Sequence, residues 1–308
     1  PIYPSTMRYT VIVNARAGTV LEAGADAFAT RLEAAFAAHG CGADVRLVPP
    51  REIDDALSLA IEDSHAMPVL AGGDGTINGA LPVLIQADRP IGILPMGTVN
   101  VLGRDLGLFG TLEQQVAALC GGEPVEMDVG RVNDRLFHSI SGMGFFSLMA
   151  REREYARRRF PFSRAAAFGI AATRSILFTR PVTLDIAVGG DHRIVEADAV
   201  LVTVNRFEGA DWRRPQLDEG VFEVHVLNAG GLYSRGKAAL SVVSGHWRDS
   251  HNLTSFTGDA VTLTRRDKRR GHITFDGEVE RKAGPLRYGL TTPWSGTTAA
   301  LAARPASH

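Results

Sequence analysis

The sequence has few of the residues that mark disulfide-rich or membrane-spanning proteins. Only two of its 308 residues are cysteines, Cys41 and Cys120, and their spacing matches no metal-binding or disulfide framework. No apolar run approaches the roughly 18 residues that a membrane-spanning helix needs. The net charge is −1, and 45% of the residues are hydrophobic. These features argue against a disulfide scaffold and a membrane span, and they favour a globular cytoplasmic protein with two domains.

The nearly neutral net charge hides an uneven distribution of basic residues. Residues 151–180 contain eight Arg and two Glu, and residues 265–270, RRDKRR, contain five basic residues and one acid. Such segments suit an anionic partner or surface, and a solvated charged face explains them equally well. They contain no recognisable nucleic-acid motif, so we expect no nucleic-acid partner.

The first 127 residues alternate between two patterns. Short apolar runs typical of buried strands occur at 9–14, 44–48, 67–71 and 91–95. After each run, apolar residues recur at helical spacing. Strands that alternate with helices predict an α/β fold with a doubly wound parallel sheet over residues 7–127.

From about residue 128 the pattern changes to an alternation of period two. It is clearest at 182–188, 199–204 and 220–227, and it predicts a C-terminal antiparallel β-sandwich domain over residues 128–284. Within it, residues 145–180 favour a helix. The tail from about 285 to 308, which includes the run LRYGL, is expected to return to the first domain.

The loop AGGDGTINGA, residues 71–80, combines several glycines with a single acid. The predicted strand ends at Ala71 and a helix follows, so the loop lies at the carboxyl edge of the sheet, where α/β folds bind ligands. Glycines let the backbone approach a phosphate, and the helix dipole favours the anion. The carboxylate of Asp74 would repel a phosphate unless a cation bound together with it. Asp74 therefore suggests Mg²⁺ binding or a role as proton acceptor. A tight turn in which Asp74 caps the next helix is the alternative.

Two further strand-to-helix turns are predicted at the same edge. The fourth strand is followed by Gly97, Thr98 and Asn100. In the first turn, NARAGTV, Asn14 and Gly18 could close the same pocket, and Arg16 could meet a phosphate. We therefore expect three loops to converge on one anion site.

These motifs, taken in order, resemble one known family. GGDGTIN, followed by ILPMGTVN and LGRDLGL, resembles the diacylglycerol kinase catalytic family, which includes bacterial lipid kinases and sphingosine kinases. NARAG, the segment MDVGRVNDRLFHSISGMGF (127–145) and the late FDGE (275–278) extend the resemblance over nearly all of residues 7–290. The glycine loop alone is less specific, because NAD kinases and phosphofructokinases carry a similar one.

The resemblance implies an ATP- and Mg²⁺-dependent lipid kinase whose lipid enters between two lobes. Glu278 matches the family's proposed base, and Asp74 is the competitor for that role. Asp276 and Asn100 would support them. If residues 272–280 form one strand, Asp276 and Glu278 share a face; the alternative is a hairpin turn at the Asp-Gly pair. The residues implied to bind the nucleotide are Asn14, Gly18, Gly72, Gly73, Asp74, Gly75, Thr76, Asn78, Gly97 and Thr98.

Bacterial relatives also carry a structural Mg²⁺ site in the second lobe. QLDEGV (216–221) lies at the matching place, with the carboxylate of Glu219 and the carbonyls of Gln216 and Val221 as ligands, all oxygen donors that suit Mg²⁺. An ordinary turn is the alternative. The chain departs from the family at Val48 and Val101, where a polar residue and an acid are usual.

We therefore expect a kinase that phosphorylates a lipid hydroxyl, most simply that of diacylglycerol. An NAD kinase-like enzyme and a catalytically silent lipid- or nucleotide-binding protein are the alternatives. The protein would act from the cytoplasm and bind transiently to the inner face of the membrane as a peripheral protein. The oligomeric state is not indicated. The residues expected to contact the membrane are Arg151, Arg153, Arg157, Arg158, Arg159, Arg164, Phe160, Phe162 and Phe168.

Overall fold

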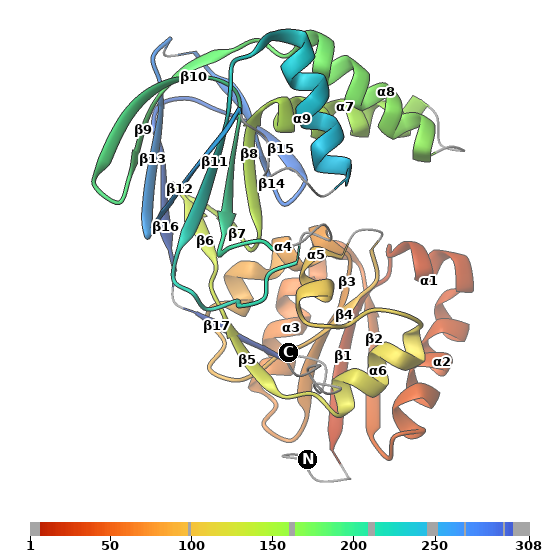
Figure 1. The fold of residues 1–308 in the computed structure, drawn as a ribbon. Helices are drawn as coiled ribbons and strands as arrows, with labels where there is room; N and C mark the ends of the chain where they lie inside the picture. Colours follow the sequence, from red (N-terminus) through yellow and green to blue (C-terminus); the bar gives the residue numbers. More distant parts are fainter. Residues whose placement is uncertain are drawn as a thin grey trace, which may run out of the picture. The chain divides into compact units, whose positions relative to one another are not determined.

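The structure, a computed structural model, divides the chain into two compact units. It describes residues 7–97, 100–159, 164–208, 213–244, 252–267, 269–291 and 293–297, with the backbone alone at 153–159, 164–168 and 238–244. Unit 1 comprises the chain up to Met127 and from Thr292 onward, and unit 2 comprises Asp128–Thr291 (Figure 1). Each unit has its own sheet and its own hydrophobic core.

Unit 1 contains a four-stranded parallel sheet in the order β2-β1-β3-β4. The strands are β1 (Arg8–Asn14), β2 (Gly42–Val48), β3 (Met67–Gly72) and β4 (Gly92–Pro95). Successive residues Val11, Ile12 and Val13 are all fully buried, because both faces of the sheet are covered. Continuous burial of this kind is typical of parallel strands, and it explains why these segments lack alternation in the sequence.

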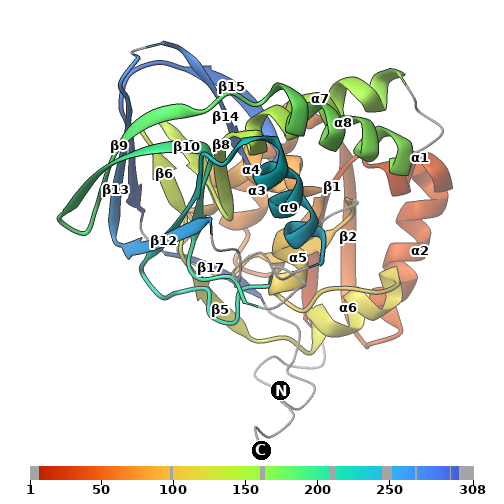
Figure 2. The same ribbon diagram turned by 45° about the horizontal axis from the view of Figure 1, so that its top comes forward.

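Helices cover both faces of this sheet (Figures 1 and 2). On one face, α2 (Ala25–Ala37) and α6 (Leu112–Cys120) pack Phe36 and Leu119 against Val69. On the other, α3 (Ile53–Glu62) contacts β1 and β3, and α4 (Asp74–Leu84) contacts α3. The predicted doubly wound α/β arrangement is confirmed. The shorter helices are α1 (Gly18–Ala23), η1 (Pro50–Glu52) and α5 (Val101–Asp105).

The end of the chain returns to unit 1 as a single strand. Strand β17 (Trp294–Thr297) pairs antiparallel with β5 (Pro124–Met127), and Gly296 forms a bridge with Ile91 beside β4. The run LRYGL, which we expected in this returning tail, is instead β16 (Leu286–Leu290) of unit 2. The physical reason is packing, because Leu286 and Tyr288 on one face of the strand are buried in the core of the second unit.

Unit 2 is built on one antiparallel sheet of eleven strands among the described residues. Nine of them follow the order β15-β14-β8-β10-β9-β13-β16-β6-β7. The other two branch from this order, since β11 pairs with β10 and β12 pairs with β11. The strand β10 (Asp191–Val204) pairs with β9 through its first half and with β8 and β11 through its second, across an irregularity near Ala197. Phe137 on β7, at one end of the order, stacks against Phe222 on β11 and Phe275 on β14. The sheet therefore folds back on itself around one core, which is the two-layered β-domain that the sequence predicts. The remaining strands are β6 (Gly130–Val132), β7 (Arg135–Phe137), β8 (Ile140–Gly144), β9 (Val182–Val188), β11 (Phe222–Asn228), β12 (Leu253–Gly258), β13 (Ala260–Arg265), β14 (Gly271–Phe275) and β15 (Glu278–Lys282).

Three helices belong to unit 2, namely α7 (Phe145–Arg159), α8 (Arg164–Phe178) and α9 (Gly231–Ser244). Phe145 of α7 packs with Ala199 and Leu227, residues of β10 and β11 that face away from the folded core. The helical pattern expected over 145–180 is therefore a pair of helices. In the described part of the chain, no helix has the length and hydropathy needed to cross a membrane.

Candidate functional site

Three loops meet at the carboxyl edge of the unit 1 sheet. The loops after β3 and β4 touch through their glycines, since a Cβ on Gly97 would lie 2.9 Å from the Cα of Gly73. The amide of Met96, which directly follows β4, donates to the carbonyl of Gly72 at 2.8 Å. Gly73 and Gly97 must be glycines because a side chain on either residue would push the two loops apart. The glycines expected to approach a phosphate thus also bring two loops into contact.

Asp74 ties these two loops together. One oxygen of its carboxylate accepts the Asn100 amide and the other accepts the Val101 amide, each at 2.9 Å. Asp74 therefore caps the first turn of α5, a different helix from the one it begins. Asn100 has φ 50°, in the left-handed region, and its side chain bonds to both the amide and the carbonyl of Gly97. The alternative in which Asp74 caps the helix that directly follows is therefore wrong, because the carboxylate accepts amides of α5 instead.

The loop after β1 joins the same cluster through side chains. The Asn14 amide group donates to the Thr76 hydroxyl at 2.8 Å. Asn78, two residues further along α4, is 4% exposed, and both polar atoms of its side chain lack a hydrogen-bond partner among the described residues. Gly18 is exposed in α1, and no described contact brings it to this cluster. Thr98 lies outside the described residues.

The cluster has the physical character of an anion site. Helix α4 starts at Asp74 without a side-chain cap at Gly73, so its first amides and its positive dipole end face the loops. Each oxygen of Asp74 accepts one N–H and keeps a further lone pair, which leaves the carboxylate able to bind a cation accompanying phosphate.

In unit 2, the Asp276-Gly277 pair forms a hairpin turn between β14 and β15. Asp276 has φ 47° and Gly277 has φ 93°, and Phe275 pairs with Glu278 across the turn. Two left-handed residues are what the tightest hairpins require. The expectation of one continuous strand over 272–280 is therefore wrong, and Asp276 and Glu278 do not lie on one face of a strand.

The carboxylate of Asp276 anchors this hairpin to a distant loop. It accepts the backbone amides of His138, Ser139 and Ile140 at 2.8 to 3.0 Å, and the Ser139 hydroxyl at 3.0 Å. These donors lie in the connection between β7 and β8 and at the first residue of β8. Asp276 therefore determines where the hairpin, and with it Glu278, is held.

Glu278 begins β15 in a network of charges. Its carboxylate accepts a hydrogen bond from Arg135 of β7, whose Nε also lies 3.4 Å from Glu280. Lys282 lies 3.2 Å from Glu280 and from Asp134, and the hydrogen bond to Glu280 holds the pKa of Lys282 above its ordinary value. Arg135 was not identified from the sequence, because nothing in the pattern pairs residues 143 positions apart.

The loop expected to hold a second Mg²⁺ is occupied by protein donors. The Glu219 carboxylate accepts the Arg206 amide at 3.0 Å and its guanidinium at 3.4 Å, and the Val221 carbonyl accepts the Asn205 amide at 2.8 Å. Gln216 is exposed. Among the described residues, no three His, Cys, Asp or Glu side chains are gathered as a metal cluster. Arg206 thus supplies positive charge to Glu219, and the Mg²⁺ site stays a prediction.

The structure describes little of the expected membrane patch. Arg151 lies 3.1 Å from Glu152, which also pairs with Arg174 at 2.6 Å. Glu152 is buried, so this pairing differs from the solvated helix face that the sequence offered as the alternative. The residues of the patch that lie outside the described chain or side chains are Arg153, Arg157, Arg158, Arg159, Phe160, Phe162, Arg164 and Phe168.

Comparison with known proteins identifies the first unit. Residues 8–132 match the family model of the diacylglycerol kinase catalytic domain. This part of the chain is similar to the catalytic domain of diacylglycerol kinases. The chain is 26% identical over 184 residues to the diacylglycerol kinase of Staphylococcus carnosus (strain TM300), covering 58% of this chain and 59% of that protein. It is 31% identical over 182 residues to the diacylglycerol kinase of Mycobacterium tuberculosis (strain H37Rv), covering 54% and 57%. The match therefore spans under two thirds of the length of these relatives.

Solved structures extend the likeness in fold to both units. A crystal structure of a diacylglycerol kinase from Bacillus anthracis str. Sterne has a TM-score of 0.66 and 15% identity, and the match covers 97% of each chain. A second structure from that organism has a TM-score of 0.69 at 16% identity, covering 97% of this chain and 98% of that one. At such identities the similarity concerns the fold. The match to the family model thus covers part of the chain, and the likeness in fold covers both units.

Proposed function

We propose that this protein is a lipid kinase that transfers the γ-phosphate of ATP to the hydroxyl of diacylglycerol or a related lipid. Its similarity to the catalytic domain of diacylglycerol kinases supports the reaction class. The observation that carries the proposal is the contact of the two glycine loops, held by Asp74, beside the uncapped start of α4. Phosphoryl transfer requires mainly positioning and charge neutralisation, which this arrangement supplies.

In this proposal the loops after β1, β3 and β4 bind the phosphates of ATP. The glycine backbone admits the phosphate chain, the α4 dipole stabilises its charge, and Asn78 satisfies its amide on the ligand. Mg²⁺ would neutralise charge on the phosphates, with Asp74 as the carboxylate that holds it. By keeping both loops in place, Asp74 acts first as a positioning residue.

Glu278 is the proposed acceptor of the proton from the lipid hydroxyl. Its side chain is 46% exposed, which leaves it accessible to a substrate, and Arg135 supplies the compensating positive charge. The turn anchored by Asp276 limits the motion of the carboxylate. A base of this kind contributes on the order of 10²–10⁴ to the rate.

The experiment is a phosphoryl-transfer assay on the purified chain with γ-labelled ATP, Mg²⁺ and lipids in mixed micelles. Glu278→Gln is compared with Glu280→Gln, which removes the neighbouring carboxylate of the same arginine. We expect labelled lipid with wild type, a loss of about 100-fold or more in Glu278→Gln, and a change within about threefold in Glu280→Gln, since exposed ion pairs contribute little. Label in NAD, or bound ATP without labelled lipid, would contradict the proposal and favour an NAD kinase or a silent binder.

A further inference from the structure

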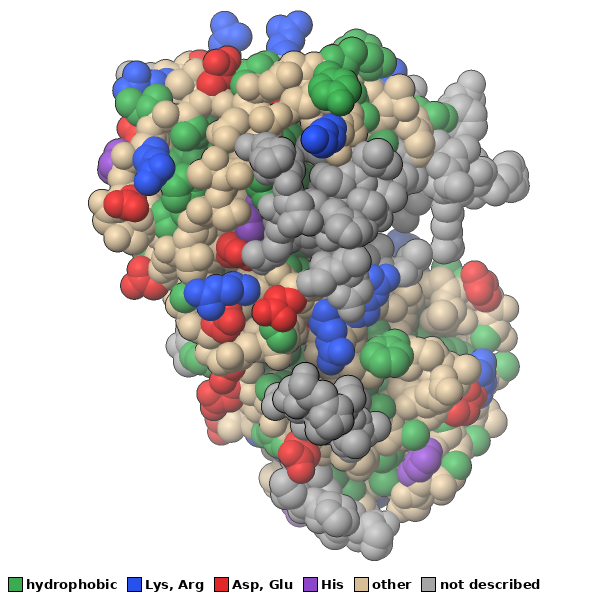
Figure 3. All heavy atoms as spheres, viewed as in Figure 1, with side chains coloured by type: hydrophobic (Ala, Val, Ile, Leu, Met, Phe, Trp, Pro, Cys, Tyr) green, Lys and Arg blue, Asp and Glu red, His purple; other side chains and the backbone are tan. Residues whose placement is uncertain are grey.

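Large apolar side chains are exposed where α8 ends and α9 begins in unit 2. These two helix ends lie side by side, because Arg235 of α9 donates a hydrogen bond to the Ile176 carbonyl of α8 at 3.4 Å. Figure 3 shows hydrophobic side chains gathered at the top of the unit, with Lys and Arg side chains near them. The exposed fractions are 53% for Leu177, 61% for Phe178, 54% for Leu232 and 85% for Tyr233.

The two chain segments that carry these side chains contain basic residues and no acids. Residues 164–184 contain three Arg and residues 229–248 contain two Arg and one Lys, and neither segment contains Asp or Glu. Arg180 and Lys237 are exposed and form no ion pair with any side chain that the structure describes. Arg174 and Arg235 add no free charge, because they pair with Glu152 and Asp198. Two free cations therefore border the apolar side chains.

We propose that Leu177, Phe178, Leu232, Tyr233, Arg180 and Lys237, here called the α8–α9 end surface, dock this protein on an anionic lipid bilayer. Tyr233 and Lys237 are four residues apart on α9 and so share one helix face. Aromatic residues with a polar group favour the interface between water and lipid, and basic residues beside them are attracted to anionic headgroups. The inference rests on the proposed function, because a diacylglycerol acceptor lies in a bilayer.

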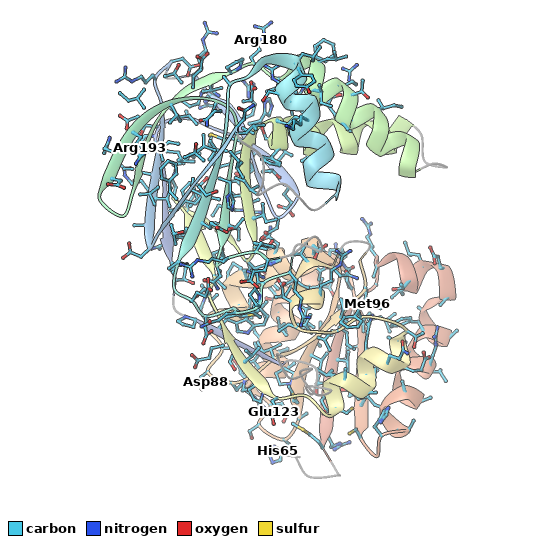
Figure 4. The ribbon with its side chains drawn as sticks, viewed as in Figure 1. His65, Asp88, Met96, Glu123, Arg180 and Arg193 are labelled. Carbon is cyan, nitrogen blue, oxygen red and sulfur yellow. The ribbon has the colours of Figure 1, made fainter. Side chains whose placement is uncertain are left out.

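This surface differs from the Arg-rich segment at 151–168 that the sequence suggested. Arg193 also lies in unit 2 but extends from the side of β9 and β10, where it stacks on Phe256 (Figure 4). The argument for the α8–α9 end surface is the combination of exposed aromatic and aliphatic side chains with two cations that form no ion pair with a described side chain. A surface that bound a protein through apolar contacts alone would not require Arg180 and Lys237 beside the apolar side chains.

The test is co-sedimentation of the full chain with phosphatidylcholine vesicles that contain or lack one third phosphatidylglycerol. We expect wild type to bind only the anionic vesicles, and less strongly as salt is raised. Arg180→Gln with Lys237→Gln should lower the vesicle partition coefficient roughly 25-fold, at about fivefold per charge. Phe178→Ser with Tyr233→Ser should lower it at least about tenfold. Phe109→Ser and Arg51→Gln, which change exposed residues of unit 1, are the matched controls and should bind as wild type.

Equal binding to neutral and anionic vesicles, or undiminished binding by both double variants, would overturn the proposal. Sedimentation velocity that finds a wild-type dimer and monomeric variants would also overturn it, because the surface would then join two copies.

Kinase activity is measured on vesicles and on a dispersed short-chain diacylglycerol, and the ratio of the two activities should fall in the variants. If wild type labels no lipid but the vesicle binding follows the expected pattern, the proposed function fails and the docking surface stands.

Discussion

Asp74 and Asp276 are carboxylates that hold backbone amides from distant segments. Asp74 accepts two amides of the loop after β4, and Asp276 accepts three amides and a hydroxyl from the end of β7 to the start of β8. A carboxylate that accepts several N–H groups is well suited to this task because it offers about four lone pairs. Both residues therefore position loops, in addition to any part they take in the chemistry.

The positioning role of Asp74 leads to a prediction for Asp74→Asn. An Asn side chain offers one oxygen and one NH₂ group, so one of the two amides loses its acceptor. We expect the free energy of unfolding to fall by about 1–3 kcal/mol and lipid phosphorylation to fall about 100-fold as the loops shift. Urea unfolding and the labelled-phosphate assay measure the two effects.

The matched control for this variant is Asp88→Asn, an exposed aspartate of the same unit (Figure 4). It should unfold and react as wild type. Lost activity in Asp74→Asn with unchanged stability would instead mean that the carboxylate acts on the reactants and that the loops hold without it.

At the level of elements, α7 and α8 are joined by an ion pair between a buried acid of α7 and an arginine of α8. Glu152 of α7 is buried and lies 2.6 Å from Arg174 of α8 and 3.1 Å from Arg151. Burial alone would raise the pKa of Glu152, but hydrogen bonds from Arg174 and Arg151 lower it on balance. The ion pair therefore contributes to holding the helix pair together whenever Glu152 is ionised.

The lowered pKa of Glu152 predicts a dependence of stability on pH. A carboxylate whose pKa is lower in the folded state contributes fully above its ordinary value, about 4.3, and loses this contribution as pH falls through the folded value. We expect the melting temperature of wild type to fall more steeply between about pH 5 and 3 than that of Glu152→Gln. Thermal unfolding followed by circular dichroism gives both curves. Exposed Glu196→Gln should follow wild type, and parallel curves for all three proteins would contradict the argument.

For the whole molecule, the two units differ in how the chain builds them. Unit 2 is continuous in sequence, and its sheet folds back on one core that includes Phe137, Phe222 and Tyr288. Unit 1 takes strands from both ends of the chain, because β17 pairs with β5 beside β4. Trp294 on β17 is 1% exposed, so the returning segment contributes a large side chain to the unit.

The closing strand predicts a local effect for Trp294→Ala. Removing a fully buried Trp side chain costs about 3–5 kcal/mol, and the loss should lie in unit 1. Hydrogen exchange read by mass spectrometry should show lower protection in β1, β3 and β4, with little change in β10, β11 and β13. Phe109→Ala, which shortens an exposed side chain of the same unit, should change stability by less than about 0.5 kcal/mol. Equal loss of protection in both units would show that β17 does not act on unit 1 alone.

The sequence predicted those features that depend on neighbouring residues. Apolar runs with a helical pattern between them predicted the strands and helices of unit 1, because a parallel strand is buried on both faces. Period-two alternation predicted the antiparallel strands of unit 2, and Asp-Gly was open to interpretation as a hairpin turn. The order of the motifs was enough to suggest the family.

Contacts between remote segments needed the tertiary structure. Asp74 with Val101, Asp276 with Ser139, and Glu278 with Arg135 are each separated by at least 27 positions, and no local periodicity records such a pairing. The same holds for β16, whose alternation fits any half-buried sheet, so only packing decided that it belongs to unit 2. Sequence by itself therefore determined the elements, the motifs and the class of chemistry. The tertiary structure decided which carboxylates position loops and which one pairs with arginine. Only the folded chain brings each charged side chain close to its partner.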